Sequence, residues 1–161
     1  MRPETRRMVV VGIGNPDRGD DGAGRAVTQY LRGRLPAHVE VAELDGEATS
    51  LLPLLDGATA AFLIDACVSD AEPGTVRRFD VAQLPLPKAG FGVSTHGLGL
   101  AEAIELARAL GQLPPLCVVY AIEAVSVEQG HPLSRPVTAA VDIVGEKVQA
   151  EIQLAEGDRH A

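Results

Sequence analysis

Runs of hydrophobic residues divide the chain into strands and helices. Apolar runs rich in β-branched residues at 8–12, 58–64 and 116–122 have the length of strands. The last two are apolar almost throughout, which is typical of central strands that are buried on both faces. Residues 39–44 and 75–81 alternate between apolar and polar positions, and the second of these segments favours an edge or antiparallel strand.

Between these strands the apolar residues recur with the spacing of helices. The expected helices lie at 21–34, 49–55 and 97–110, and a glycine or proline shortly after each one favours its end. A last helix is expected after Ser134, a residue type preferred at helix caps. Residues 82–95 contain several prolines and glycines and are expected to form a long loop. The last helix has one apolar stripe: Val137, Val141, Val144, Val148 and Ile152.

This order of elements predicts a single α/β domain over residues 1–161, with 1–7 and 155–161 frayed. Its architecture is three layers, α/β/α, around a mostly parallel twisted sheet with one antiparallel or edge strand. Because right-handed crossovers join parallel strands, the loops after the first, third and fifth strands should meet at one edge of the sheet. Side chains on those loops are the first candidates for a functional site.

The composition narrows the classes of partner. Hydrophobic residues make up 46% of the chain, as in globular proteins, and the formal net charge is −8. This charge argues against nucleic acid and anionic membranes as partners, because phosphate binding needs clustered Lys and Arg. The first apolar run is too short for a secretory signal, so we expect a cytoplasmic protein. Cys67 and Cys117 match no metal or redox spacing and are expected to be free, mostly buried thiols.

A glycine-rich turn with several carboxylates follows the first strand. It begins with Gly-Ile-Gly-Asn at 12–15, but Asp17 stands where a dinucleotide-binding turn needs its third glycine. Gly19 is followed by Asp20 and Asp21 rather than by the lysine of a phosphate-binding loop. The turn therefore suits a cation better than a phosphate. Asp20 taken alone also has a structural explanation, because Asp is a preferred helix cap.

Three side chains are expected to converge at the edge of the sheet. Asp21 follows the first strand, Asp65 follows the third, and His96 precedes the helix after the long loop. Two carboxylates and one imidazole form a plausible metal site with open positions. Each residue taken singly also fits a structural role, Asp65 in a turn and His96 in an exposed loop or helix cap. Their joint position favours the metal site.

Other ionisable or nucleophilic residues carry weaker signals. Glu123 and His131 follow the last strand and are further candidates at the same edge. His38 lies at a helix–strand turn and His160 in the tail, so both are discounted. The chain has no Gly-x-Ser-x-Gly motif, and Cys67 has no base beside it in the sequence, so nucleophilic catalysis has little support.

The separated motifs resemble those of the nickel–iron hydrogenase maturation proteases. They are Gly-Ile-Gly-Asn at 12–15, Gly-Asp-Asp-Gly-x-Gly at 19–24, Asp65, and His-Gly-Leu-Gly-Leu at 96–100. The resemblance extends over residues 8–123, and the combination is more specific than any single motif. It implies an α/β sheet between helices, in agreement with the pattern of strands and helices.

The resemblance also implies an activity. Asp21, Asp65 and His96 would take the places of the family's metal-contacting residues, and these three also form the candidate catalytic constellation. The implied reaction removes a short C-terminal extension from a hydrogenase large-subunit precursor after nickel insertion. The nickel belongs to the substrate, so no permanent cofactor is expected. The expected partner is this precursor, and we expect the protein itself to be a monomer.

One departure from the family and two alternative functions remain. Many members have Asp-Gly-Gly after the second strand, where this chain has Asp45-Gly46-Glu47, so the subfamily and substrate choice stay open. One alternative is a nickel-sensing chaperone that cuts nothing. The other is a peptidyl-tRNA hydrolase, which shares the Gly-x-Gly-Asn-Pro turn. The acidic charge and the missing Thr-Arg-His-Asn segment oppose this second alternative.

Overall fold

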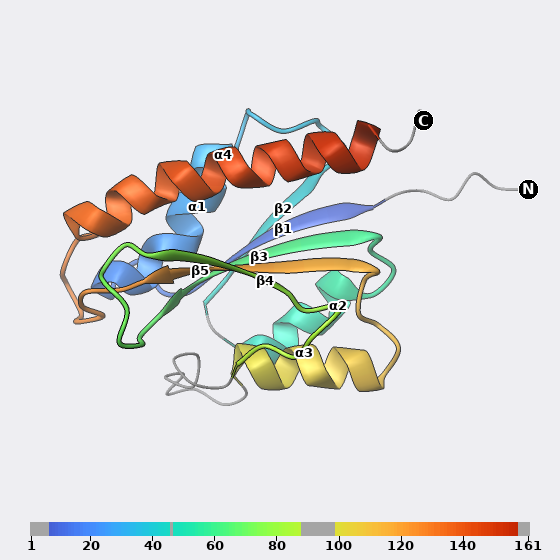
Figure 1. The fold of residues 1–161 in the computed structure, drawn as a ribbon, viewed down its shortest axis with the longest axis horizontal. Coiled ribbons are helices and arrows are strands. Elements are labelled where there is room, and N and C mark those ends of the chain that lie inside the picture. The colour runs from blue at the N-terminus through green and yellow to red at the C-terminus, as the bar shows by residue number, and fades with distance from the viewer. Residues whose placement is uncertain (1–6, 46, 88–98, 158–161) are drawn as a thin grey trace, which may run out of the picture.

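The structure, a computed structural model, describes residues 7–45, 47–87 and 99–157. Its centre is a five-stranded sheet with the strand order β2-β1-β3-β5-β4 (Figure 1). The strands are β1 (Met8–Ile13), β2 (Glu40–Leu44), β3 (Ala60–Cys67), β4 (Val76–Asp80) and β5 (Leu116–Glu123). All neighbouring pairs are parallel except β4 with β5, so β4 is the antiparallel edge strand that its alternating sequence predicts.

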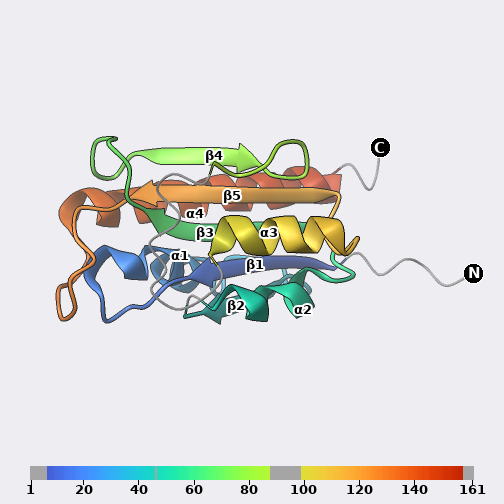
Figure 2. The same ribbon diagram turned by 90° about the horizontal axis from the view of Figure 1, so that it is seen from below.

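Helices cover both faces of the sheet, as the sequence predicts. The α-helices are α1 (Ala23–Leu31), α2 (Leu52–Leu55), α3 (Leu100–Ala109) and α4 (Arg135–Gly157). Two short 3-10 helices, η1 (Gly19–Gly22) and η2 (Ala48–Leu51), precede α1 and α2. Figures 1 and 2 show α1 and α4 on one face and α2 and α3 on the other. The expected three-layer α/β/α fold is confirmed.

Alternation along β3 divides the interior into two hydrophobic cores. Phe62 and Ile64 point into the core beneath α1 and α4, whereas Ala61 and Leu63 point into the core beneath α2 and α3. All four are fully buried, which explains why this strand reads as a continuous apolar run. Asp65 is next in the alternation after Leu63 and so belongs to the α2–α3 face of the sheet.

Several boundaries differ from those expected. β3 continues to Cys67 because pairing with β5 extends three residues past the apolar run, so Asp65 lies within the strand and not after it. α1 is preceded by a 3-10 turn and ends at Leu31, three residues early, where Gly33 with a φ of +80° follows. Residues 88–95 of the expected loop, and the start of the helix expected at 97, lie outside the described residues.

Arg7 and residues 155–157, which the sequence assigns to frayed ends, are bound to the rest of the domain. Arg7 donates from both terminal guanidinium nitrogens to the carbonyl oxygens of Leu54 and Asp56, at 2.9 and 2.8 Å. α4 continues to Gly157, so residues 155–157 are helical although the sequence favours a frayed tail from 155. In both cases tertiary contacts, rather than the local sequence, extend the ordered region.

Gly24 allows α1 to pack directly on the carboxyl ends of β1 and β3. A Cβ atom at Gly24 would lie 2.3 Å from the carbonyl oxygen of Ile64 and 2.7 Å from the backbone of Ile13. Gly12 faces it, and a Cβ there would lie 2.5 Å from the carbonyl oxygen of Gly24. Because these atoms belong to the backbone, a side chain could be accommodated only by displacing the helix or the strands.

We predict that Gly24→Ala lowers the free energy of unfolding by about 2 kcal/mol or more, because the new methyl group overlaps backbone atoms. Gly157→Ala is the matched control, since a Cβ at Gly157 has no neighbour within 4 Å. It should change stability by about 0.5–1 kcal/mol at most, in the stabilising direction. Urea denaturation followed by circular dichroism measures both, and equal stability of the two variants would contradict the close approach.

Candidate functional site

The carboxyl ends of β1, β3 and β5 lie at one edge of the sheet, on the left in Figure 1. The turn after β1 and the loop after β5 are joined there by two backbone hydrogen bonds. Asp20 N–H donates to the Ser126 carbonyl at 2.8 Å, and Gly130 N–H donates to the Asp17 carbonyl at 2.7 Å. The loops that the sequence predicts at this edge therefore do meet.

The Gly-Asn turn positions Asp21. The Asp21 carboxylate accepts a hydrogen bond from the backbone N–H of Asn15 at 2.9 Å. Gly14 has a φ of +134°, and a Cβ there would lie 1.9 Å from the carbonyl oxygen of Asp21. Glycine is required because the turn packs against the backbone that carries the carboxylate. The glycines of the motif thus shape the turn around Asp21.

Asp65 lies close enough to Asp21 for the two charges to interact. Burial raises the pKa of Asp65 to about 8, and the negative charge of Asp21 adds to this increase. Within the described part of the chain, neither carboxylate forms an ion pair with a Lys, Arg or His. The structure therefore brings together two of the three residues predicted to form the site, without a counter-charge between them.

His96 lies outside the described residues, so its position relative to Asp21 and Asp65 stays a prediction. Among residues 7–45, 47–87 and 99–157, no three His, Cys, Asp or Glu side chains form a group that could hold a metal ion. Asp45 and Glu47, the second of which replaces a glycine of the family motif, are exposed.

Asp20 does not cap α1, contrary to its structural explanation. Its side chain is 1% exposed and accepts hydrogen bonds from Val125 N–H at 2.7 Å and from both the N–H and hydroxyl of Ser134, at 2.7 and 2.9 Å. A longer contact of 3.4 Å joins it to Ser126 N–H. The turn aims Asp20 away from its own helix, so the carboxylate instead holds the loop between β5 and α4.

Glu123 is a second buried carboxylate at the same edge, on the face that carries Asp65. It is 1% exposed and accepts hydrogen bonds from Ser69, one from the N–H at 2.7 Å and one from the hydroxyl. The Cys67 thiol lies 3.7 Å from one carboxylate oxygen, and burial raises the pKa of this thiol. Arg77 on β4 supplies the nearest positive charge, 3.9 Å away.

Sequence reasoning missed Ser69 and Arg77. Neither belongs to a motif, and Arg77 is brought to this edge by antiparallel pairing between segments far apart in the chain. The alternation of 75–81 indicates which strand residues share a face, but it contains no information on register. Cys67 and Cys117 are free and buried, as the sequence predicts.

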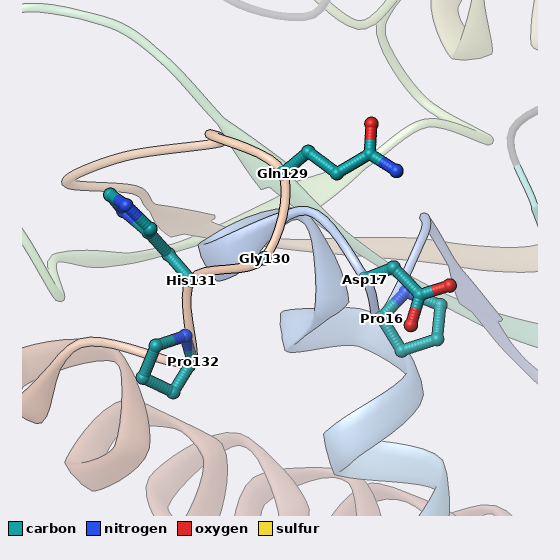
Figure 3. Close-up of a pocket in the computed structure, with 6 residues that line it drawn as sticks. All are labelled: Pro16, Asp17, Gln129, Gly130, His131 and Pro132. Carbon is teal, nitrogen blue, oxygen red and sulfur yellow. The ribbon is translucent and has the colours of Figure 1, made fainter.

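The other candidate histidine borders a separate pocket. His131 is exposed and lies 3.5 Å from the carboxylate of Glu128, and its ring points away from Asp17 in Figure 3. The pocket lies between the turn after β1 and the loop after β5, and its lining consists of Pro16, Asp17, Gln129, Gly130, His131 and Pro132. The discounted His38 pairs with Glu156 on α4.

Comparison with known proteins identifies a family for this chain. Residues 26–151 match the family model described as hydrogenase maturation protease. The chain belongs to the hydrogenase maturation protease family. The hydrogenase 2 maturation protease of Escherichia coli K12 is 30% identical over 152 residues, with 91% of each chain covered.

Solved structures of family members share the fold. The hydrogenase maturating endopeptidase HybD from E. coli superposes with a TM-score of 0.77 and 27% identity, over 92% of this chain and 93% of that one. The maturation protease HycI from Thermococcus kodakarensis superposes with a TM-score of 0.70 at 24% identity, over 89% and 90% of the two chains.

Membership of this family makes the protein a peptidase of hydrogenase maturation. The non-catalytic chaperone and the peptidyl-tRNA hydrolase therefore lose their support. None of the described helices is long and apolar enough to cross a membrane.

The raised pKa of Asp65 predicts a pH-dependent cost to stability in the metal-free protein. Between about pH 4 and pH 8 the folded chain retains a proton that the unfolded chain has released, so the free energy of unfolding falls as pH rises. Asp65→Asn removes this decrease in the free energy of unfolding, because an amide carries no charge at any of these pH values. We expect the variant to be more stable than the wild type by about 1–2 kcal/mol at pH 8.

Thermal unfolding of both proteins at pH 5 and pH 8 measures the effect, and the difference in Tm should grow with pH. Asp70→Asn makes the same chemical change at an exposed position and should give no such trend. A difference in Tm between wild type and Asp65→Asn that does not change with pH would show that Asp65 is not destabilised by its surroundings.

Proposed function

We propose that this peptidase removes a short C-terminal extension from the large-subunit precursor of a nickel–iron hydrogenase after nickel has been inserted. Two observations support this function. One is the match to the maturation protease family, and the other is that Asp21 and Asp65 lie close together at the carboxyl edge of the sheet with no ion-pair partner among the described residues. The second observation carries the proposal, because two neighbouring carboxyl groups without a counter-charge in the described part of the chain form a local site that favours a cation.

The cation is the nickel of the substrate. Asp21 and Asp65 supply carboxylate ligands, and His96 adds an imidazole that suits nickel. The thiolates that hold nickel in the product are softer ligands than carboxylates, so the peptidase releases the ion once the substrate has been cut. The protein then needs no resident metal, and nickel marks a precursor that is ready for processing.

Bound nickel would polarise the carbonyl of the scissile peptide bond and so favour attack by water. A carboxylate at the site would accept a proton from this water molecule. Asp21 is held by Asn15 at 2.9 Å, which fixes the direction of its carboxylate. The loop braced by Asp20 borders the same turn and limits its movement.

The substrate protein is the only macromolecular partner in this proposal. The net charge of −8 opposes binding to nucleic acid or to anionic lipid. We propose that the protein acts as a monomer. We place it in the cytoplasm, where hydrogenase precursors would reach it before they fold around their finished metal site.

We predict that His96→Ala and Asp65→Asn each slow processing by at least about a hundredfold, since a metal that polarises a carbonyl contributes several kcal/mol to catalysis. Mass spectrometry of a nickel-loaded precursor after incubation with each variant measures the shortened large subunit. His38→Ala is the matched control, because this imidazole pairs with Glu156 away from the site.

Circular dichroism should show intact folds for all three variants. If His96→Ala unfolds the protein, the imidazole is structural. If the wild type leaves the nickel-loaded precursor at full length, the proposed substrate is wrong.

The metal dependence gives a second test. The purified protein should be folded without metal, because its strands and helices form two apolar cores. Nickel or cadmium should raise Tm by a few degrees in proportion to the logarithm of the free ion concentration. Chelator should leave the circular dichroism spectrum unchanged. One tightly held zinc ion per chain, or collapse on chelation, would indicate a conventional metallohydrolase instead.

A further inference from the structure

Strand pairing places an arginine in the same cross-sheet row as Asp65. Asp65 on β3 pairs with Ala121 on β5, and Ala121 pairs with Arg77 on β4. Residues in one row point to the same face of a sheet, so Arg77 lies on the face that carries Asp65, two strands away. The residue between them has only a methyl side chain. Arg77 therefore lies on the β4 side of the candidate site, and Figure 2 shows β4 next to β5 at the edge of the sheet.

One nitrogen anchors the guanidinium of Arg77. Its Nη2 donates to the Ser69 hydroxyl at 3.0 Å and lies 3.6 Å from the Cys67 sulfur. The guanidinium also lies over the ring of Phe79, 5.7 Å from its centre. These contacts hold the side chain at the edge of the sheet, in a direction set by β3 and its following loop.

The remaining donors of Arg77 are not fully used. Its Nε is buried and has no hydrogen-bond partner, while 39% of the side chain is exposed. The Glu123 carboxylate lies 3.9 Å from Nη2, as a long ion pair, and already accepts two hydrogen bonds from Ser69. Arg78, the next residue, donates from both Nε and Nη2 to Glu151 on the opposite face.

We propose that Arg77 is a specificity-determining residue that binds a carboxylate of the substrate's C-terminal extension. The inference rests on the proposed function and names the chemistry that the site selects. A guanidinium attracts a carboxylate and donates charge-assisted hydrogen bonds to it, and 39% of the Arg77 side chain is exposed to a bound peptide. The negative charge of Asp21, which lies close to Asp65, repels an acidic group from the centre of the site. A carboxylate is therefore accepted beside Arg77, which sets the register of the peptide across the sheet edge.

Two neighbouring arginines provide the test. With the nickel-loaded precursor as substrate, Arg77→Gln should raise KM about tenfold to a hundredfold and leave kcat within about threefold, because it removes charge-assisted binding rather than chemistry. Arg77→Lys should recover part of the loss, since it keeps the charge without the fork of donors. Arg78→Gln makes the same change of charge on the other face and should leave KM unchanged.

The substrate supplies the second half of the test. One precursor has every Asp and Glu of its extension replaced by Asn and Gln, and another ends in an amide. One of these two precursors lacks the carboxylate that Arg77 binds. With that precursor, the KM of the wild-type enzyme should rise as much as it does when Arg77→Gln acts on the normal precursor. The KM of Arg77→Gln should be the same for the normal and the altered precursor. The two forms distinguish an acidic side chain from the terminal carboxylate.

The outcomes separate this inference from the proposed function. An unchanged KM for Arg77→Gln overturns the inference. An increase in KM that is the same for charged and neutral extensions also overturns it, and Arg77 is then only a structural partner of Glu123. If the wild type cuts no precursor, the proposed function fails, yet fluorescence anisotropy with the labelled extension peptide still tests Arg77. Weaker binding by Arg77→Gln than by Arg78→Gln would then support the inference, and equal binding would overturn it.

Discussion

The whole site depends on the direct packing of α1 against the ends of β1 and β3. At Gly12 and Gly24 the helix and the strands touch through their backbones, with no side chain between them. This contact fixes the path of the turn that leads from β1 into α1. Because Asp21 lies on that turn and Asp65 on β3, the same contact determines how close the two carboxylates come. Any residue with a side chain at Gly24 would separate the elements that carry the site.

The carboxylates at this edge of the sheet lie in two different kinds of surroundings. Asp20 and Glu123 are buried but satisfied, since backbone and hydroxyl groups of the adjoining loops donate to them. They brace the loops after β3 and β5. Asp21 and Asp65 lie close enough to interact and have no cationic partner among the described residues, and burial together with the charge of Asp21 raises the pKa of Asp65. A functional site commonly concentrates such unfavourable charge, which the rest of the fold must tolerate.

The proposed chemistry requires two kinds of recognition from one edge of the sheet. Carboxylates and an imidazole detect a metal, and a guanidinium on the far strand detects the peptide that must be removed. The distance of two strands between Arg77 and Asp65 separates these tasks in space. A precursor without nickel would lack the first contact and a mature subunit without the extension would lack the second, so only the correct intermediate would make both.

The sequence by itself determined the fold class, the order of the elements and the edge at which the loops after β1 and β5 meet, because hydrophobic periodicity and right-handed crossovers are local or nearly local properties. It also singled out Asp21 and Asp65 because each follows an apolar run, although Asp65 lies within β3. Tertiary structure decided that Asp20 turns to the loop beyond β5 and that Arg77 shares a row with Asp65. Both depend on register and on contacts between distant segments, which no local pattern encodes.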